Sequence, residues 1–545
     1  MKSTTLTGKG STKTDALLER SLKKTRETLD ILDKLNVIGA ALSTETDIDK
    51  MLEMILEMAQ DAMKADGGML YRLTPEQTLK FAIIQNKTLK IRMGGTSGNA
   101  ITLADIPLSI EGKPNHSAIA AHCAITRQSV NVSDAYTKKG FDFSGAKSFD
   151  AKMGYRTSSV LATPIIGHDG TLLGVLQLVN CLNERGAIEP FSASAQKMAA
   201  SLSSQAGIAL SNRLLIIQLY DLFEGLTNLI NTAIDEKSPY TGGHCKRVPE
   251  LTLMLAEAAH NESTGPLANF QMTDKDRYEL KIAGMLHDCG KITTPVHVVD
   301  KGTKLETIFD RIELISMRFE LARKDIQARY HSACKTNPEA SDQLKVALVN
   351  DTRQIDEDLN FLRKCNIGVE RMQEEDVSRV KQIAQQTWLD HEGKSQPLIT
   401  ENELKNLTIV AGTLTQDERM IINHHIVSTI SLLEKMPWPE HLKNVTEYAG
   451  GHHERMDGKG YPKGLTRDQM SLQARMMGIA DIFEALTAVD RPYKKGMPLT
   501  QSLAIMNRMK NEGHIDPDLF DVFIKHNIPN EYAKRHLALA QINID

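Results

Sequence analysis

Histidine and aspartate recur in the C-terminal half of the chain at positions that could hold metal ions. In chain order they are His244, His287, Asp288, His425, His452, His453 and Asp481. Imidazole and carboxylate ligands suit Mn, Fe, Zn or Ni, and a carboxylate that bridges several histidines suits a two-metal site. Because two such metals generate hydroxide near neutral pH, hydrolysis of a phosphoester is the chemistry that these residue types favour.

The sequence around these residues strengthens the metal hypothesis. Asp481 lies inside the apolar segment GIADIFEAL, and His287 and Asp288 follow the apolar run KIAGML. An unpaired carboxylate would be costly to bury in such a setting, and a bound cation removes that cost. A single helical histidine is more often an ordinary core or surface residue than a ligand. Five separate clusters along one chain favour a site.

Five segments in one order carry a family resemblance: TGGH, HDCGK, HHERMDGKGYP, IADIFEALTA and DRPYK. They resemble the HD-GYP family of cyclic di-GMP phosphodiesterases. The resemblance covers about residues 220–500, with the inserted segment excluded. The resemblance implies an all-α, metal-dependent phosphohydrolase that opens cyclic di-GMP to pGpG. Onward hydrolysis to GMP is left open. Some members carry a glutamate ligand for a third metal where this chain has Tyr240. We therefore expect two divalent metal ions, Fe or Mn.

The resemblance also implies a role for each ligand. One metal would be held by His244, His287, Asp288 and Asp481, and Asp288 would bridge to a second metal held by His425, His452 and His453. His424 and His425 compete for one position, because adjacent helix residues point about 100° apart and only one can face the metals. The family spacing to Leu432 and Leu433 selects His425.

Substrate contacts are implied in the same way. Asp288 and Lys291 are the expected catalytic residues, with Lys291 meeting a phosphate oxygen. Arg491 and Lys494 in DRPYK would hold the nucleotide phosphates as charge-assisted donors. The remaining substrate-binding residues, which would shape the loop beside the site, are Gly460, Tyr461 and Pro462.

The elements that must position this site begin with an N-terminal sensor. Residues 35–215 are predicted to form an α+β domain, an antiparallel sheet with flanking helices, and Asp169-Gly170 between two apolar runs predicts a hairpin. The segment GYRTSSVLATPIIGHDGTLLGVLQLVN resembles a GAF domain. The pattern of cyclic-nucleotide-binding GAF domains is absent, since Cys181 follows Asn180. A small-molecule pocket and a purely dimerising domain both remain open.

Helices connect and extend these two domains. Residues 192–235 contain no proline and favour one long helix, spanning roughly 65 Å at 1.5 Å per residue, that joins the sensor to the HD-GYP domain of residues 220–545. Residues 1–34 carry a narrow leucine stripe, which either packs on its own domain or pairs in a parallel dimer. Residues 310–405 are predicted to be an inserted helical hairpin.

Composition excludes several classes of function. The chain has 545 residues, a net charge of -4 and six scattered cysteines. A general electrostatic interaction with nucleic acid or anionic lipid is not expected, and the thiols are expected to be reduced. The sequence contains no run of about 18 uncharged apolar residues, so no membrane span is predicted. A cytoplasmic location is expected.

Three functional hypotheses arise from the sequence. The leading one is a bacterial, GAF-regulated phosphodiesterase, a homodimer that cleaves cyclic di-GMP and carries a GAF domain with a possible small-molecule ligand. The second keeps the same chemistry on another cyclic dinucleotide, such as cyclic GMP-AMP. The third is a catalytically idle scaffold that docks a cyclase-type protein partner.

Overall fold

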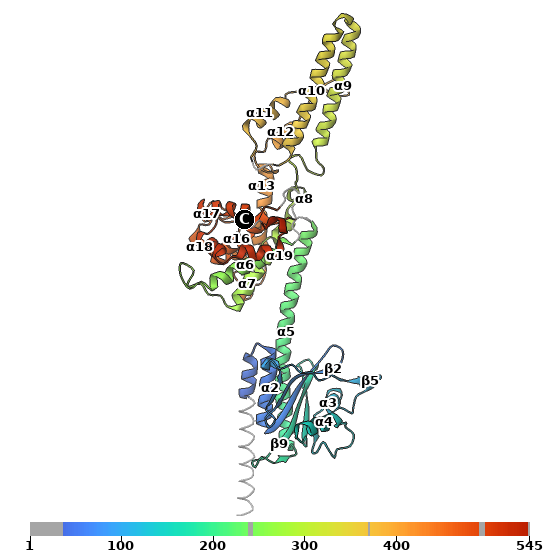
Figure 1. The fold of residues 1–545 in the computed structure, drawn as a ribbon, viewed down its shortest axis with the longest axis vertical. Coiled ribbons are helices and arrows are strands. Elements are labelled where there is room, and N and C mark those ends of the chain that lie inside the picture. Colours follow the sequence, from blue (N-terminus) through green and yellow to red (C-terminus); the bar gives the residue numbers. More distant parts are fainter. Residues whose placement is uncertain (1–35, 238–242, 369–370, 490–495, 543–545) are drawn as a thin grey trace, which may run out of the picture. The chain divides into compact units, whose positions relative to one another are not determined.

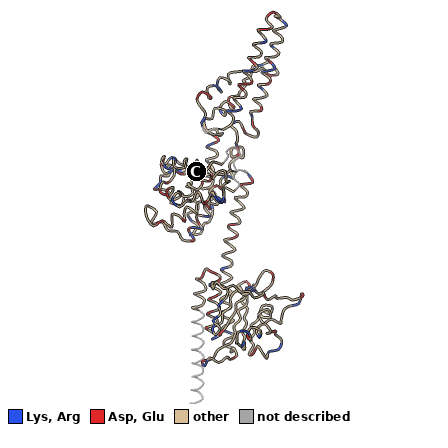
Figure 2. The backbone as a smooth tube through the Cα atoms, viewed as in Figure 1, with Lys and Arg blue, Asp and Glu red and all other residues tan. Residues whose placement is uncertain are grey.

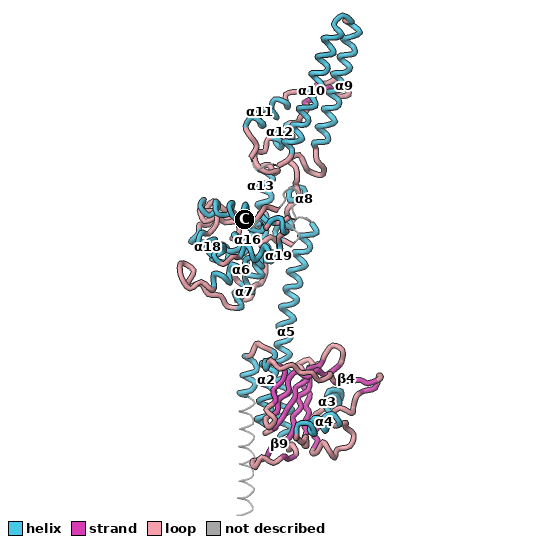
Figure 3. The backbone as a smooth tube through the Cα atoms, viewed as in Figure 1, coloured by secondary structure: helices cyan, strands magenta, loops and turns pink. Residues whose placement is uncertain are grey.

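The computed structural model describes residues 36–237, 243–368, 371–489 and 496–542 (Figure 1). The predicted helical segment 1–34 and Tyr240 lie outside the described residues. The chain divides into two compact units, Met1–Leu222 and Phe223–Asp545. Nearly all strands belong to the first unit, and the second is largely helical (Figure 3).

The first unit is built on one antiparallel sheet with the strand order β3-β2-β1-β9-β8-β7. The strands of this path are β1 (Ala65–Leu73), β2 (Thr78–Asn86), β3 (Ile91–Gly94), β7 (Val130–Val132), β8 (Val160–Ile166) and β9 (Leu172–Leu182). Short strands complete the unit: β4 (Ile106–Pro107), β5 (Ser109–Ile110), β6 (Lys113–Pro114) and β10 (Ile188–Glu189). The predicted hairpin is β8–β9, whose turn contains Asp169 and Gly170.

Apolar side chains cover both faces of this sheet. On one face Ile55 of α2 (Ile48–Ala62) and Leu202 of α5 (Ala193–Lys237) pack in one cluster with sheet residues. On the other, Cys123 of α3 (Ile119–Thr126) packs with Tyr71 and Val175; α4 (Ser144–Met153) follows β7. The sheet therefore forms the middle layer of an α+β domain, which agrees with the predicted fold class.

Helix α5 has 45 residues and confirms the predicted long helix. At Gly207, in the first half of α5, the helix backbone packs directly against Ile166 at the end of β8. A Cβ at this position would lie 2.0 Å from the carbonyl oxygen of Ile166, so no side chain fits there. The boundary between the units, after Leu222, falls inside this helix.

The second unit is a helical domain around one core. Its helices are α6 (His244–His260), α7 (Asp274–Leu286), α8 (Val296–Val299), α13 (Gln416–Asn423), α14 (His425–Leu433), α15 (Val445–Gly450), α16 (Leu472–Thr487), α17 (Leu499–Asn511), α18 (Pro517–Lys525) and α19 (Ile528–His536). A 3-10 turn, η2 (Cys289–Thr293), follows α7. Leu251, Ile282 and Phe483 bring α6, α7 and α16 together in the core. This packing fixes the start of α6, the end of α7 and the middle of α16, which carry predicted ligands.

An insertion with its own core interrupts this domain. It consists of α9 (Ile312–Thr336), α10 (Ser341–Asn366), α11 (Glu374–Ile383), β11 (Thr387–Leu389), β12 (Ser395–Pro397) and α12 (Glu401–Leu407). Ile315, Leu362 and Val380 belong to its apolar cluster, which shares no residue with the core of the surrounding domain. The hairpin α9–α10 matches the prediction, whereas the small two-stranded sheet β11–β12 was not predicted.

Charges of both signs are interspersed along the chain (Figure 2). Among the described residues, no helix is both long enough and apolar enough to pass through a bilayer.

Candidate metal centre

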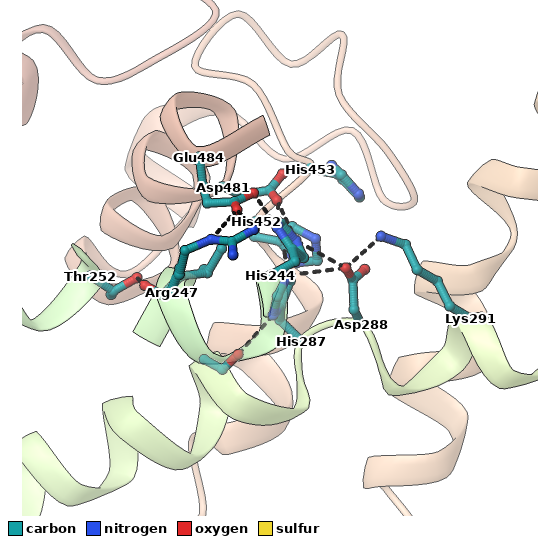
Figure 4. Close-up of polar contacts among 12 residues, drawn as sticks. His244, Arg247, Thr252, His287, Asp288, Lys291, His452, His453, Asp481 and Glu484 are labelled. Carbon is teal, nitrogen blue, oxygen red and sulfur yellow. Dashed lines mark hydrogen bonds and ion pairs between the residues drawn. The ribbon is translucent and has the colours of Figure 1, made fainter. Parts of the chain in front are cut away.

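The seven predicted metal ligands meet at one place in the second unit. Figure 4 labels all of them except His425. Their positions in the chain are the start of α6 (His244), the end of α7 (His287, Asp288), the start of α14 (His425), the turn after α15 (His452, His453) and the middle of α16 (Asp481). All except the half-buried His453 and Asp481 are buried. The fold thus brings together residues that lie more than two hundred positions apart in the sequence.

One group of donor atoms surrounds the Oδ2 atom of Asp288. The Nε2 atoms of His244 and His287 each lie 3.2 Å from Asp288 Oδ2. His244 Nε2 is also 3.2 Å from Oδ1 of Asp481. Ligand atoms that surround one ion at about 2.1 Å lie about 3 Å from one another, so these spacings suit a shared cation.

A second group faces the other oxygen of the same carboxylate. Nε2 of His425 lies 3.3 Å from Asp288 Oδ1, and Nε2 of His453 lies 3.3 Å from Nε2 of His425. His452 completes this group, because donor atoms of His425, His452 and His453 lie within 4.8 Å of one another. Asp288 therefore presents one oxygen to each group. His424, the competing neighbour of His425, is exposed.

Backbone carbonyls orient three of the imidazole rings. Nδ1 of His287 donates to Gly284 O (2.7 Å), Nδ1 of His452 to Ala449 O (2.6 Å) and Nδ1 of His425 to Ile422 O (2.5 Å). In each case the bond occupies Nδ1 and leaves the Nε2 lone pair directed at the centre. Such outer hydrogen bonds fix the tautomer that a metal requires.

His244 is oriented differently, by a buried ion pair that the sequence analysis missed. Its Nδ1 donates to Glu484 Oε2 at 2.5 Å. The other oxygen of Glu484 accepts from Nε and Nη2 of Arg247 at 2.8 and 2.7 Å. Glu484 follows Asp481 by three residues and Arg247 follows His244 by three, so one helical turn separates each from a predicted ligand. That spacing was the available signal.

The surroundings of Asp288, His452 and His453 shift their pKa values toward the protonation states that bind metal. Burial alone would raise the pKa of Asp288, but Lys291 and His287 lower it, so this pKa lies well below the usual range. Burial depresses the pKa of His452 strongly and that of His453 to about 4. Ionised carboxylates and neutral imidazoles are the forms in which these side chains bind metal.

Two orphaned atoms test whether a cation fits. Oδ1 of Asp288 and Nε2 of His452 are buried and have no hydrogen-bond partner among the described residues. A buried acceptor without a partner costs about 1–3 kcal/mol, and a cation would satisfy both atoms. The nitrogen and oxygen donors suit divalent ions such as Mn, Fe or Zn. The residues therefore fit the metals that the family resemblance implies.

The predicted substrate contacts divide into two groups. Lys291 Nζ lies 2.5 Å from Asp288 Oδ2, next to the centre. The ring of Tyr461 stacks on His453, with centroids 4.9 Å apart, and Pro462 follows it after a cis peptide bond. Gly460 lies against Glu454 and Arg455 so closely that a Cβ would be 2.4 Å from Arg455 N. Arg491 and Lys494 lie outside the described residues.

Buried Glu454 holds the Gly-Tyr-Pro loop in place. Its carboxylate accepts hydrogen bonds from the backbone N–H groups of Lys463 (2.7 Å) and Leu465 (2.8 Å). The loop therefore forms a fixed wall beside the second group of donors. Glu454 is a further residue that the sequence analysis did not assign.

Comparison with known proteins assigns both domains. Residues 47–210 match the family model described as GAF domain, and residues 401–519 match the model described as HD domain. The chain thus carries a GAF domain followed by an HD domain, which confirms the resemblance found in the sequence.

Two curated relatives are similar to part of the chain. A 3'3'-cGAMP-specific phosphodiesterase of Vibrio cholerae is 38% identical over 125 residues, 23% of this chain and 26% of the relative. A cyclic di-GMP phosphodiesterase of Pseudomonas aeruginosa is 49% identical over 114 residues, 21% of this chain and 26% of the relative. The match thus spans about a quarter of these relatives' length.

A solved structure is similar to part of the chain. The GAF domain of an Acinetobacter phosphoenolpyruvate-protein phosphotransferase matches with 17% identity and a TM-score of 0.26. The match covers 34% of this chain and 97% of that structure.

Proposed function

We propose that this protein is a metal-dependent phosphodiesterase that hydrolyses cyclic di-GMP to pGpG, with onward hydrolysis to GMP as an alternative end point. The observation that carries the proposal is the position of Asp288, which directs one carboxylate oxygen at each of two histidine groups. Two cations bridged by one carboxylate are the arrangement used to clamp both the attacking and the leaving oxygen of a phosphoester. The relatives named above act on cyclic dinucleotides, which supports this substrate class.

The chain offers ligands for two ions, and we propose Fe or Mn. The first would be held by His244, His287, Asp288 and Asp481, and the second by Asp288, His425, His452 and His453. When bound, the ions supply positive charge that polarises the phosphodiester and lowers the pKa of water. Imidazole and carboxylate together favour these metals over Ca²⁺, which prefers oxygen ligands alone.

Other residues of the chain would bind and orient the substrate. Lys291, whose ammonium group lies beside the centre, would donate to a non-bridging phosphate oxygen and stabilise the charge that develops there. Tyr461, stacked on His453, would limit how the phosphodiester approaches. Hydrolysis breaks one P–O bond, adds the oxygen of water to phosphorus and leaves a proton on the released ribose oxygen.

The substrate assignment has one close alternative, 3'3'-cGAMP, because several of the similar relatives carry that name. Metal ligands act on the phosphodiester and do not distinguish the bases. Parallel assays of both dinucleotides, with products separated by chromatography, decide between them. The preferred substrate is the one with the higher kcat/KM.

The phosphodiesterase proposal is tested with full-length protein loaded with Mn or Fe. Wild type should convert cyclic di-GMP to pGpG or GMP, and Asp288→Asn should lose both turnover and bound metal, because the bridging position requires a full carboxylate charge. Asp274→Asn, which changes an exposed carboxylate of the same unit, is the matched control. Metal-loaded wild type that cleaves neither dinucleotide would instead favour the idle scaffold that docks a cyclase-type partner.

We further propose that the GAF domain regulates this activity. The proposed divisions are residues 35–215 for the sensor, 192–235 for the connecting helix and 220–545 for the enzyme with its insertion at about 310–405, preceded by the segment 1–34. A small-molecule ligand of the GAF domain and a purely dimerising role remain alternatives. Ligand-induced shifts in the melting temperature of full-length protein would separate them. We also propose that the protein is a homodimer.

A further inference from the structure

The part of α5 that belongs to the second unit, residues 223–237, is fixed on the helical domain. Lys281 Nζ of α7 donates to both carboxylate oxygens of Glu224 at 2.9 Å. The ring of Phe223 packs edge-on against Trp438, with centroids 6.1 Å apart, and Ile234 is buried in the core of the domain. This end of α5 therefore has a defined position relative to the metal centre.

Lys237, the last residue of α5, contacts the backbone next to that centre. Its ammonium group donates hydrogen bonds to the carbonyl oxygens of Ile292 and Lys291, the second at 3.3 Å. Both carbonyls belong to the 3-10 turn η2, which follows Asp288 directly. Lys237 thus caps the carboxyl end of this turn, as lysine side chains can do at the end of a helix.

The sequence of η2 explains why the turn accepts a donor from outside. In a 3-10 helix the carbonyl of one residue accepts from the N–H group three positions later. For Lys291 this donor is Thr294 N, at 3.1 Å. For Ile292 it would be Pro295, which has no N–H group. The Lys237 ammonium group therefore supplies a hydrogen bond that Pro295 cannot.

Helix α14 holds the beginning of the same turn. Gly290 N donates to Thr429 Oγ1 at 2.9 Å, and a Cβ on Gly290 would lie 2.0 Å from the carbonyl oxygen of His425. Lys291 lies between this attachment and the one made by Lys237, and its Nζ is 2.5 Å from Asp288 Oδ2 (Figure 4). The direction of the Lys291 ammonium group hence depends on both attachments of the turn.

We propose that Lys237 is a positioning residue for the phosphodiesterase reaction, which holds the η2 turn so that the Lys291 ammonium group meets the phosphate beside the metals. The role rests on the proposed function and goes beyond it, because Lys237 lies outside every motif that carries the family resemblance. A displacement of about 1 Å in a catalytic group can lower the rate roughly a hundredfold, so the effect of losing Lys237 belongs mainly to kcat.

Lys237→Met in full-length, Mn-loaded protein tests this role. Methionine has a helix propensity close to that of lysine, so α5 should persist while the ammonium group is lost. On the preferred cyclic dinucleotide kcat should fall roughly tenfold or more, with KM and bound metal close to wild type. Lys237→Arg, which keeps charged donors, should recover most of the lost kcat. Lys435→Met, which changes an exposed lysine of the same unit, is the matched control and should behave as wild type.

A double variant separates positioning from a general loss of stability. If Lys237 acts through Lys291, Lys237→Met should have little further effect on kcat in a Lys291→Ala background, because the group that it positions is already absent. Circular dichroism shows whether each variant is folded, and Lys237→Gln replaces Lys237→Met in the same comparison if the latter is unfolded. Losses that multiply in the double variant, or a wild-type kcat in the folded single variant, would overturn the proposal.

Hydrogen exchange distinguishes a failure of this proposal from a failure of the proposed function. In Lys237→Met the amides of residues 289–294 should exchange faster than in wild type, and Lys237→Arg should restore their protection, whether or not the protein cleaves a dinucleotide. A wild type that cleaves neither dinucleotide would remove the proposed function. Unchanged exchange across the η2 turn would remove the role of Lys237.

Discussion

Glu484 distinguishes His244 from the other histidines of the centre. Three rings donate to neutral carbonyls, whereas His244 donates to a carboxylate that is itself held by Arg247. Glu484→Gln should lower the affinity of the first metal roughly 10–100-fold, because the amide is neutral and cannot accept from both neighbours with equal strength. Titration of metal-free protein with Mn, followed by metal analysis, measures this.

The matched control for that experiment is Glu512→Gln, an exposed glutamate of the same unit. It should bind both ions as wild type does. Unchanged affinity in Glu484→Gln would mean that the ion pair only contributes to packing between α6 and α16.

Lys291 is expected to act on the substrate and not on the metals. Lys291→Ala should keep the metal content of the protein. It should raise the activation free energy by about 3 kcal/mol, which lowers kcat roughly a hundredfold, the usual effect of losing one donor to a developing negative charge. Lys435→Ala removes an exposed lysine of the same unit and should change nothing. A normal kcat in Lys291→Ala would show that its contact with Asp288 is only structural.

At this scale the residue types that meet at the candidate centre could be predicted from the sequence, because paired motifs such as His287-Asp288 and His452-His453 are contiguous. The ion pair behind His244 could not, since Arg247 and Glu484 lie 237 positions apart and each resembles an ordinary helix residue. Only the packing of α6 against α16 brings them together.

Two buried lysines between α8 and α9, just before the insertion, provide a matched pair for a stability prediction. Lys304 has no exposed surface, and its ammonium group donates hydrogen bonds to Leu407 O (3.2 Å) and Met372 Sδ (3.4 Å). Lys301 is also buried, but it bonds to both oxygens of Glu418. Burial lowers the pKa of both amines.

Lys304→Met should stabilise the second unit by about 1–3 kcal/mol, because a side chain of similar length no longer buries an amine that has no carboxylate ion-pair partner among the described residues. Lys301→Met should destabilise it, because Glu418 loses its partner. Urea unfolding measures both changes in the free energy of unfolding. A Lys304→Met protein that is less stable than wild type would contradict this account.

The same lysine predicts a pH dependence. Because the folded-state pKa of Lys304 lies below its unfolded value, the folded state binds fewer protons in the interval between them, and stability rises with pH there. The cost is present in full below the folded pKa and disappears as the pH approaches the unfolded value, near 10.4. As the pH rises toward about 10.4, urea midpoints should therefore rise more for wild type than for Lys304→Met. Parallel curves would exclude Lys304 as the source.

How well each helix or strand could be predicted depends on how strong its local sequence signal is. The hairpin β8–β9 and helix α5 could be predicted because an Asp-Gly turn between apolar runs, and a long stretch without proline, are strong local signals. The strands β11 and β12 have three residues each and little apolar alternation, so their pairing depends on the insertion's own core.

On the scale of the whole molecule, metal binding and its regulation should be separable. All seven candidate ligands belong to the second unit, so a fragment of residues 220–545 should still bind metal. Its specific activity should differ from that of the full chain if the first unit regulates the second. Equal activity at matched metal content would leave the GAF domain as a dimerising or localising module.

Insertions in α5 near Asn212 test how the two units communicate. Four inserted residues rotate the downstream part of the helix by about 40° and two rotate it by about 200°, at 100° per residue, without changing any ligand. Seven residues return the downstream part to within about 20° of its original direction and are the matched control. Activity should change with four and two residues and be retained with seven. The same activity for all three would exclude transmission by helix rotation.

The insertion also sets the order in which the centre can be completed during protein synthesis. His244, His287 and Asp288 leave the ribosome first, and the separate core of α9–α12 is made before His425. At ~5–20 residues per second, the roughly 140 residues between Asp288 and His425 take about 7 to 30 s. In that interval the bridging carboxylate has imidazole neighbours on one side only. A nascent chain can therefore offer at most a half-formed site, and loading of both ions must follow release of nearly the whole polypeptide.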